Sequence, residues 1–212
     1  PQDELMISVW GAAENNYKVK VNPDGSIRIP NVGPIFISGM PIDLATKKIT
    51  SSLKAIYAGI NLSNSSANKV YVDISLTNVR RVQIDLIGEV KVPGTYSLSA
   101  LSTVMNALYA AGGPNVNGTF RNILHTRNGI VIGNLDIYDY LLNGSVNSNN
   151  TLRDQDVIIV RPFKKRIELK GEIKRPGKFE LKRGETFSDL LEYSGGFTSR
   201  AFKDVISVVR VD

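Results

Sequence analysis

The first eighty residues alternate between apolar and polar positions in short segments separated by turn residues. The alternation over 5–10 and 70–76 predicts two half-buried strands. Apolar positions on both sides of the Asn-Pro-Asp-Gly-Ser segment at 22–26 predict a β-hairpin, and 35–38 predicts a further short strand. Because these strands frame one helical segment, residues 1–80 are expected to form a small α+β domain.

The helical segment of this domain is predicted to begin near Pro41. Proline fits the first position of a helix, and Asp43 places a negative charge in the first turn. The buried face of the helix is expected to carry the large apolar side chains of the segment, which are Leu44, Ile49, Leu53, Ile56 and Tyr57. A polar loop over 61–68 then leads to the last strand.

The second half of the chain contains an internal repeat with an offset of 83 residues. The segment Gly-Glu-Val-Lys-Val-Pro-Gly at 88–94 returns as Gly-Glu-Ile-Lys-Arg-Pro-Gly at 171–177. Between 88 and 114, 10 of 27 positions are identical to their counterparts, and the similarity continues from 120–123 into 202–206. A repeat of this kind indicates two copies of one domain.

Each copy is predicted to have the same order of elements. An alternating strand leads through the Pro-Gly segment into a second strand, and a helix follows at 101–111 or 186–193. In the first copy, further strands are expected at 121–127, 130–135 and 157–160. This order fits a β-grasp, a mixed sheet crossed by one helix. The predicted domains are therefore 1–80, a first β-grasp at 81–162, and a second, incomplete β-grasp at 163–212.

Two kinds of glycine position stand out in both copies. In Pro93-Gly94 and Pro176-Gly177 the proline fixes φ and the glycine is expected to adopt a positive φ in a turn. The pairs Gly112-Gly113 and Gly195-Gly196 follow the predicted helices. Phosphate-binding glycines precede a helix N-terminus, so these pairs are interpreted as helix caps, and no cofactor-binding residue is predicted.

The net charge of +6 is concentrated at the C-terminal end, where residues 163–212 contribute +4. The run Lys164-Lys165-Arg166 raises the possibility of nucleic-acid binding. Glutamates at 168, 172, 180 and 185 interrupt the basic residues, which favours a solvated surface of mixed sign and no nucleic-acid partner. An anionic polymer passing nearby would also be attracted by this charge.

The sequence offers no constellation for catalysis or metal binding. There is no cysteine, and the single histidine, His125, lies in an alternating apolar segment without a nucleophile signature, which favours a structural or surface role. Asp3-Glu4 is interpreted as the solvated start of a strand and not as a catalytic acid and base, because the sequence places neither carboxyl group in an apolar setting. No catalytic residue, metal ligand or cofactor is predicted, and ligand-binding residues remain unassigned.

Several motifs, taken in order, resemble a known family. Asp-Glu-Leu-Met-Ile-Ser-Val-Trp-Gly at 3–11, Val-Asn-Pro-Asp-Gly-Ser at 21–26 and Ser-Gly-Met-Pro at 38–41 resemble the opening domain of bacterial outer-membrane polysaccharide export proteins. The Gly-Glu-Val-Lys-x-Pro-Gly segment and the Gly-Gly pair resemble the soluble-ligand-binding β-grasp (SLBB) domain that follows it. The family has Gly where Gln2 stands, and a Ser or Thr helix cap where Met40 stands.

The resemblance implies a non-enzymatic subunit of an export channel for capsular or extracellular polysaccharide. It implies location in the periplasm, associated with the outer membrane, and three partners: further copies of itself in a ring, the polysaccharide, and an inner-membrane polysaccharide copolymerase. Membrane anchoring is implied by the resemblance alone, since the chain has neither a lipid-attachment cysteine nor an apolar run long enough to span a bilayer.

Two other classes of function remain open from the sequence. A periplasmic glycan- or small-ligand-binding protein would use the β-grasp modules as receptors and expose an aromatic platform, for which Tyr138 and Tyr140 are the best candidates, although their spacing also fits a packed helix. A polysaccharide-cleaving enzyme would need two carboxylates flanking a cleft, and no such pair can be nominated.

Overall fold

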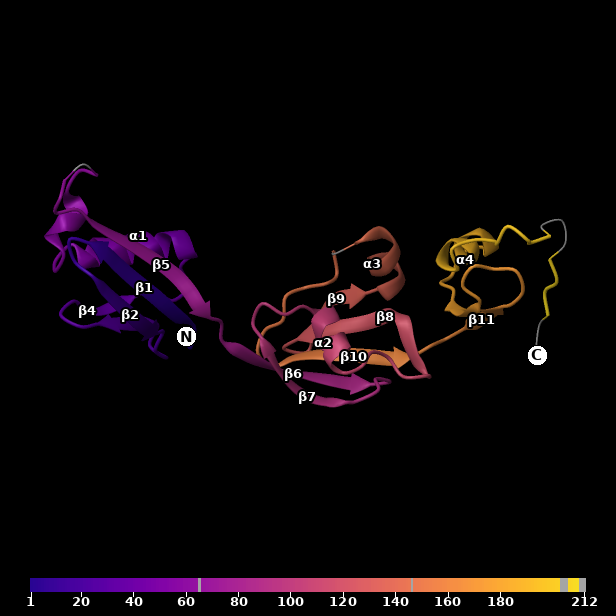
Figure 1. The fold of residues 1–212 in the computed structure, drawn as a ribbon. Helices are drawn as coiled ribbons and strands as arrows, with labels where there is room; N and C mark the ends of the chain where they lie inside the picture. Colours follow the sequence, from indigo (N-terminus) through magenta and orange to yellow (C-terminus); the bar gives the residue numbers. More distant parts are fainter. Residues whose placement is uncertain (65, 146, 203–205, 210–212) are drawn as a thin grey trace. The chain divides into compact units, whose positions relative to one another are not determined.

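The structure is a computed structural model that describes residues 1–64, 66–145, 147–202 and 206–209. The chain divides into two compact units, Pro1–Arg81 and Val82–Asp212, and Figure 1 shows the order of the elements. Both helices and strands contribute to the fold, which confirms the α+β class.

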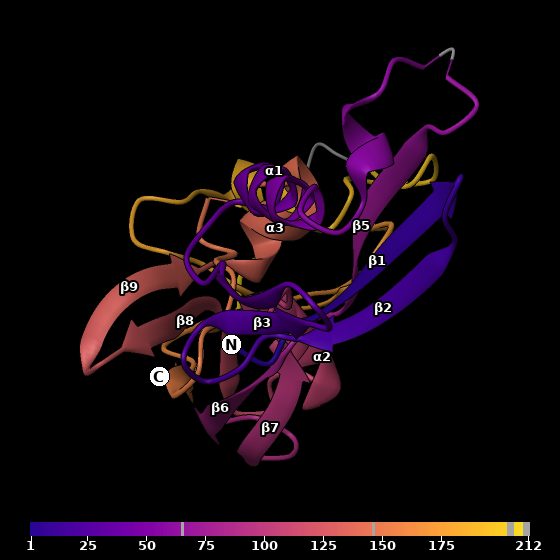
Figure 2. The same cartoon turned by 90° about the vertical axis from the view of Figure 1, so that its left-hand side faces the viewer.

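The first unit contains a three-stranded antiparallel sheet in the order β2-β1-β5, whose strands run side by side in Figure 2. A separate antiparallel hairpin, β3-β4, and one helix complete the unit. The elements are β1 (Glu4–Gly11), β2 (Asn15–Lys20), β3 (Ser26–Ile29), β4 (Gly33–Phe36), α1 (Ile42–Leu53), the 3₁₀ helix η1 (Ala58–Asn61) and β5 (Val70–Asn78).

Alternation places one face of each strand in the core of this unit. Leu5, Ile7 and Val9 of β1 are all at most 3% exposed, and they pack in one cluster with the buried side chains of α1 and of the β3-β4 hairpin. The intervening residues of β1 point away from this core. The strands predicted at the start and end of the unit are therefore correct.

Two details of the first unit differ from the sequence expectation. The segment 22–26 does make a turn, with Gly25 N–H donating to the Asn22 carbonyl over 2.9 Å, but β2 pairs with β1 while β3 pairs with β4. The predicted hairpin is thus limited to the turn itself, which the Asn22 N–H closes by donating to the Ser26 carbonyl over 2.8 Å, while β2 and β3 belong to separate sheets. Leu44 is 53% exposed, since the buried face of α1 is the row Ala45, Ile49 and Leu53.

The first β-grasp copy is a five-stranded mixed sheet in the order β7-β6-β10-β8-β9. Strands β6 and β10 are parallel, whereas β8 is antiparallel to both β10 and β9. More buried core residues come from helix α2 than from helix α3. A mixed sheet packed against one main helix is the predicted β-grasp. The elements are β6 (Arg81–Gly88), β7 (Gly94–Ser99), α2 (Val104–Ala110), β8 (Gly118–Arg127), β9 (Ile130–Leu135), α3 (Ile137–Asn143) and β10 (Asp156–Pro162).

The second copy contains β11 (Arg166–Leu169), β12 (Gly177–Glu180) and α4 (Phe187–Tyr193). Its backbone hydrogen bonds repeat those of the first copy at the same offset. Lys91 N–H donates to the Gly113 carbonyl over 3.0 Å, and the Lys174 N–H donates to the Gly196 carbonyl over the same distance. The isolated bridge between Val90 and Pro114 recurs between Ile173 and Phe197. The repeat read from the sequence is therefore one three-dimensional motif formed twice.

The glycine pairs cap both helices as predicted. Gly113 and Gly196 have φ of 80° and 86°, and each N–H donates back to a carbonyl of the last helical turn. The expectation for the Pro-Gly segments was only half correct, because Gly94 has a positive φ and Gly177 does not. The left-handed glycine shared by the two motifs is instead the first one, Gly88 or Gly171, at which the chain leaves the strand.

The predicted strand counterpart at 202–206 includes 203–205, which lie outside the described residues. Over the described ranges, no helix is long and apolar enough to cross a membrane.

Candidate functional site

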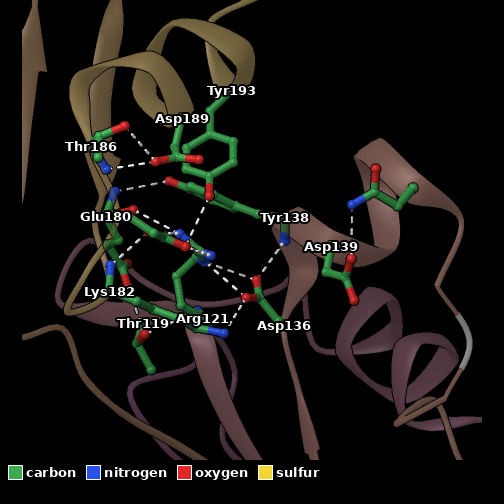
Figure 3. Close-up of polar contacts among 12 residues, drawn as sticks. Thr119, Arg121, Asp136, Tyr138, Asp139, Glu180, Lys182, Thr186, Asp189 and Tyr193 are labelled. Atoms are coloured by element: carbon green, nitrogen blue, oxygen red, sulfur yellow. Dashed lines mark hydrogen bonds and ion pairs between the residues drawn. The ribbon is translucent and has the colours of Figure 1, made fainter.

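The two β-grasp copies meet in a cluster of buried charges that we term the joint, comprising Thr119, Arg121, Asp136, Tyr138, Glu180, Lys182, Glu185 and Tyr193. Strand β8 supplies Thr119 and Arg121, and the start of α3 supplies Asp136 and Tyr138. The second copy supplies the other four residues, from β12, the loop after it and α4. Figure 3 shows Asp136, Tyr138, Glu180 and Tyr193 around Arg121.

Arg121 is the hub of the joint and is only 6% exposed. Its Nε donates to both carboxylate oxygens of Asp136 at 2.9 Å. Its Nη1 and Nη2 donate to Glu185 at 2.9 and 2.6 Å, and Nη1 also donates to the Glu180 carbonyl at 3.0 Å. One guanidinium thus binds a carboxylate from each copy, and the planar fork of donors fixes the angle between them.

The carboxylate of Glu180 makes a second connection across the joint. It is 5% exposed and accepts hydrogen bonds from the Thr119 hydroxyl at 2.6 Å and from the Phe120 N–H at 3.1 Å. Arg166 Nη2 donates to it at 3.2 Å. Because a buried carboxylate is costly unless its oxygens are hydrogen-bonded, these partners hold β12 against β8.

Aromatic rings enclose the Arg121 guanidinium. Its central carbon lies 4.6 Å from the centre of the Tyr138 ring and 5.0 Å from that of Tyr193, and the two rings meet edge to face at 5.1 Å. The Tyr138 hydroxyl accepts the Glu180 N–H at 3.1 Å, and the Tyr193 hydroxyl donates to Glu185 at 2.9 Å. Burial raises the pKa of both tyrosines, so they remain neutral hydrogen-bonding groups.

Arg121 and Glu185 hold each other in their ionised forms. Burial by itself would lower the pKa of Arg121, but the hydrogen bonds to Glu185 and Asp136 outweigh it and raise that pKa. Burial would likewise raise the pKa of Glu185, yet the hydrogen bond from Arg121 lowers it below its ordinary value near 4.5. Lys182 adds a further positive charge, with its Nζ 2.5 Å from Asp136 Oδ2. Arg121 and Glu185 are therefore both charged at neutral pH.

His125 belongs to a second buried cluster, in the core of the first copy. Both His125 and Asp156 are 0% exposed, and His125 Nε2 lies 2.8 Å from Asp156 Oδ2. Arg127 donates to both oxygens of Asp156 at 2.7 and 2.8 Å. Burial opposes ionisation of Asp156, but the hydrogen bonds from Arg127 and the Arg153 backbone lower its pKa overall.

This second cluster has the features of a structural one. A carboxylate only accepts, so His125 Nε2 is the donor, and among the described residues its Nδ1 has no hydrogen-bond partner. No nucleophile shares the cluster, and with no solvent exposure neither ring nitrogen reaches a substrate. The structural interpretation of His125 fits this environment.

The other candidates from the sequence are dispersed. Asp3 accepts from the Arg80 N–H at 2.9 Å and from Arg80 Nη1 at 3.1 Å, while Glu4 lies 3.3 Å from Lys18, so the acidic pair fastens strands. Tyr140 packs on the core of the first copy. Of the two interpretations of Tyr138 and Tyr140, the packed helix is the one that the structure shows, because α3 places Tyr138 in the joint and Tyr140 on the core.

An exposed aromatic pair does exist, in the first unit. Trp10 of β1 and Tyr71 of β5 are directly opposite in the sheet register, are 46% and 37% exposed, and stack with ring centres 5.8 Å apart. Cross-strand aromatic pairs of this kind stabilise a sheet.

Sequence reasoning missed the joint because it treated the charges after residue 163 as solvated. One signal was available in the sequence. Arg121, Ile123 and His125 are every second residue of an alternating strand, so their side chains point to the same face of the sheet. Because Ile123 is apolar, this face is expected to be the one that packs on the core. A charge at such a position needs buried partners, which the fold brings from residues 15 to 64 positions away.

Among the described residues no group of three or more histidine, cysteine or acidic side chains could hold a metal ion. The arrangement of the joint can orient the two copies and present charge.

This architecture of one α+β domain followed by repeated β-grasp domains defines a class of protein, which the comparisons with known families identify. Residues 1–75 match the family described as polysaccharide biosynthesis/export protein, and residues 81–160 and 166–212 each match the SLBB domain. The chain therefore belongs to the polysaccharide export proteins in which an export domain precedes SLBB domains.

Two curated relatives from Escherichia coli are each described as polysialic acid transport protein KpsD. Both are 30% identical to this chain over 183 residues, which are 86% of the chain and 31% of the relative. The chain thus spans about a third of the length of the curated relatives it matches.

Proposed function

We propose that this chain is the periplasmic part of an outer-membrane polysaccharide export subunit, and that copies of the subunit form a ring-shaped conduit for capsular or extracellular polysaccharide. The chain would line or support the path of the polymer without making or breaking bonds, and an inner-membrane copolymerase would deliver the polymer. The order of the three matched domains supports this proposal, as does the similarity to proteins named for polysialic acid transport. The domain limits that go with it are 1–80, 81–162 and 163–212.

The observation that carries the proposal is the joint. Tandem domains on a free linker would move independently, whereas Arg121 holds a carboxylate of each copy within 2.9 Å. A rigid connection between the repeated domains would give every subunit of a ring the same shape, as a closed symmetric assembly requires.

An edge strand with exposed aliphatic side chains supports self-association. Strand β9 is the last strand of the five-stranded sheet, and its first three residues, Ile130, Val131 and Ile132, are 68%, 54% and 38% exposed. Exposed aliphatic residues on a sheet edge favour pairing with another protein surface.

The test is made in the bacterium that encodes the full-length protein. Deleting its gene should leave polysaccharide synthesis active but trap the polymer inside the cell, and the wild-type gene should restore surface polymer. The Arg121→Met variant should restore clearly less surface polymer, because the joint loses its hub. Arg200→Met is the matched control, since Arg200 forms only an exposed pair with Glu172 at 3.5 Å.

Purified full-length protein should assemble as a large cyclic oligomer, measured by mass photometry in detergent. The proposal is wrong if the deletion strain keeps normal surface polymer, or if the protein is a monomer at all concentrations.

A further inference from the structure

A basic hollow lies where the second copy begins. It has a volume of about 570 Å³ and is lined by Lys164, Lys165, Arg166 and Lys178 together with Phe163 and Glu168. This volume falls in the range of about 300–1,000 Å³ that small-ligand sites usually occupy. The hollow thus has room for a short segment of a polymer.

Three of its positive charges are free to bind a ligand. Lys164, Lys165 and Lys178 are exposed. The ammonium groups of their side chains make no hydrogen bond or ion pair with another described residue. Lys178 lies directly opposite Glu168 in the β11-β12 register, yet Glu168 pairs instead with Lys170 at 3.2 Å. The lining therefore carries four basic side chains against the single carboxylate of Glu168, and this excess of positive charge attracts anions from solution.

The fourth positive charge is fixed in place. The Arg166 guanidinium lies 3.9 Å from the centre of the Phe163 ring. Its Nη1 donates to the Val116 carbonyl at 2.5 Å and its Nη2 to the Gly118 carbonyl at 2.8 Å. Since Nη2 also donates to Glu180 of the joint, the hollow is anchored to the same network that orients the two copies.

The chemistry of the lining favours a carboxylated glycan over a nucleic acid. Single-stranded nucleic acids are bound on several aromatic side chains that stack with successive bases. Here the single lining aromatic, Phe163, is already covered on one face by Arg166. The exposed Val116 and the amide of Asn117 complete the lining, and they offer a sugar ring an apolar contact and a hydrogen-bonding group for hydroxyls.

We propose that the basic hollow binds a segment of an acidic polysaccharide, with Lys164, Lys165 and Lys178 each attracting carboxylates of the passing chain. This inference rests on the proposed function, to which it adds the charge class of the polymer. Exposed lysine–carboxylate pairs are weak and exchange readily, so the polymer would be guided and released.

The experiment measures binding of an oligogalacturonate, which carries one carboxylate on each sugar, to the purified 212-residue chain by isothermal titration calorimetry. Binding should weaken as salt rises, because the charges involved are exposed. A neutral dextran oligosaccharide of equal length should not bind detectably. The K164Q/K165Q/K178Q variant should bind about tenfold more weakly, since each exposed pair contributes modestly.

The matched control is the K20Q/K47Q/K54Q variant, which removes the same charge from exposed lysines of the first unit. It should bind like the wild type, so that loss of net charge alone is separated from loss of the hollow. Circular dichroism should show that both variants fold as the wild type does.

Three results would overturn the inference. One is equal weakening in the two triple variants. Another is a change in Trp10 fluorescence on titration, since Trp10 is the single tryptophan of the chain and lies in the first unit, so the ligand would be at the Trp10–Tyr71 pair. The third is tighter binding of a single-stranded oligothymidylate of equal charge that is lost in K164Q/K165Q/K178Q. None of these three results concerns ring assembly or surface export. The inference about the basic hollow can therefore fail while the proposed function still holds.

Discussion

The two β-grasp copies share a motif but differ in how they are stabilised. Copy 1 buries fifteen apolar residues between a five-stranded sheet and its helices. Copy 2, within its described residues, buries three around a two-stranded sheet and one helix. A two-stranded hairpin is at best marginally stable alone, so copy 2 depends on the joint where copy 1 depends on its core. The same motif can therefore be maintained by apolar burial or by buried ion pairs.

The largest effect should come from a matched pair of core truncations. Leu86 and its counterpart 83 positions later, Leu169, are 0% and 7% exposed. Leu86→Ala should lower the free energy of unfolding of copy 1 by about 3–5 kcal/mol, because it leaves a cavity in a closely packed core. Leu169→Ala should cost about 2 kcal/mol, since a smaller cluster relaxes more easily. Urea unfolding measures both, and equal losses would contradict the comparison.

Removing the hub of the joint should destabilise copy 2 more than copy 1. Arg121→Met leaves Glu185 and Asp136 without their buried partner, at a cost of about 3 kcal/mol, the low end for buried pairs because the carboxylates are 19% and 12% exposed. Hydrogen exchange should accelerate in α4 and β12, while β6 and β10 stay protected. Uniform acceleration would mean that the two copies form one cooperative unit.

Equivalent glycines should respond differently to the same change. Gly88 has φ of 85°, and an added Cβ would lie 2.2 Å from the Val160 carbonyl oxygen, whereas at Gly171 no described atom lies within 4 Å. Gly88→Ala should therefore cost more than 2 kcal/mol, and Gly171→Ala about 1–2 kcal/mol from backbone strain alone. Thermal unfolding distinguishes the two, and similar losses would contradict the close approach at Gly88.

The smallest effect should be a local loosening of copy 2 in acid. The helix caps correspond, but Asn106 bonds the Thr103 N–H in copy 1 and Asp189 bonds the Thr186 N–H in copy 2. Hydrogen bonds from Thr186 lower the pKa of Asp189 below its ordinary value near 3.8, and those from Arg121 lower that of Glu185 below 4.5. Because both are lowered, their stabilisation is complete above the ordinary pKa and is lost as pH falls through the folded one.

Amide NMR between pH 6 and pH 3 should therefore show α4 fraying before α2. The Asp189→Asn variant, which gives copy 2 the cap of copy 1, should reduce the pH dependence of α4. If α2 frays at the same pH as α4, the difference in caps is not the cause.

The sequence contained more of the fold than of the site. The strands could be predicted from the alternation of apolar and polar residues over β1, β6 and β8. The ends of α2 and α4 could be predicted from the glycine pairs that follow them. Both features depend on neighbouring residues in the sequence. Strand pairing around 22–26 was missed because the turn residues there are conspicuous, whereas β2 pairs with the preceding strand β1 and β3 with the following strand β4. Leu44 was misplaced by its size, although the spacing of Ala45, Ile49 and Leu53 gives the buried row.

The amino-acid sequence by itself determined the two copies, their caps, the absence of cysteine chemistry and the family, since each follows from residue type and short-range spacing. Only the tertiary structure decided that Arg121 is the centre of a joint, that His125 is buried on Asp156, and that four basic residues line one hollow with a single glutamate. Those properties depend on which distant charges meet away from water, and the fold alone sets those distances.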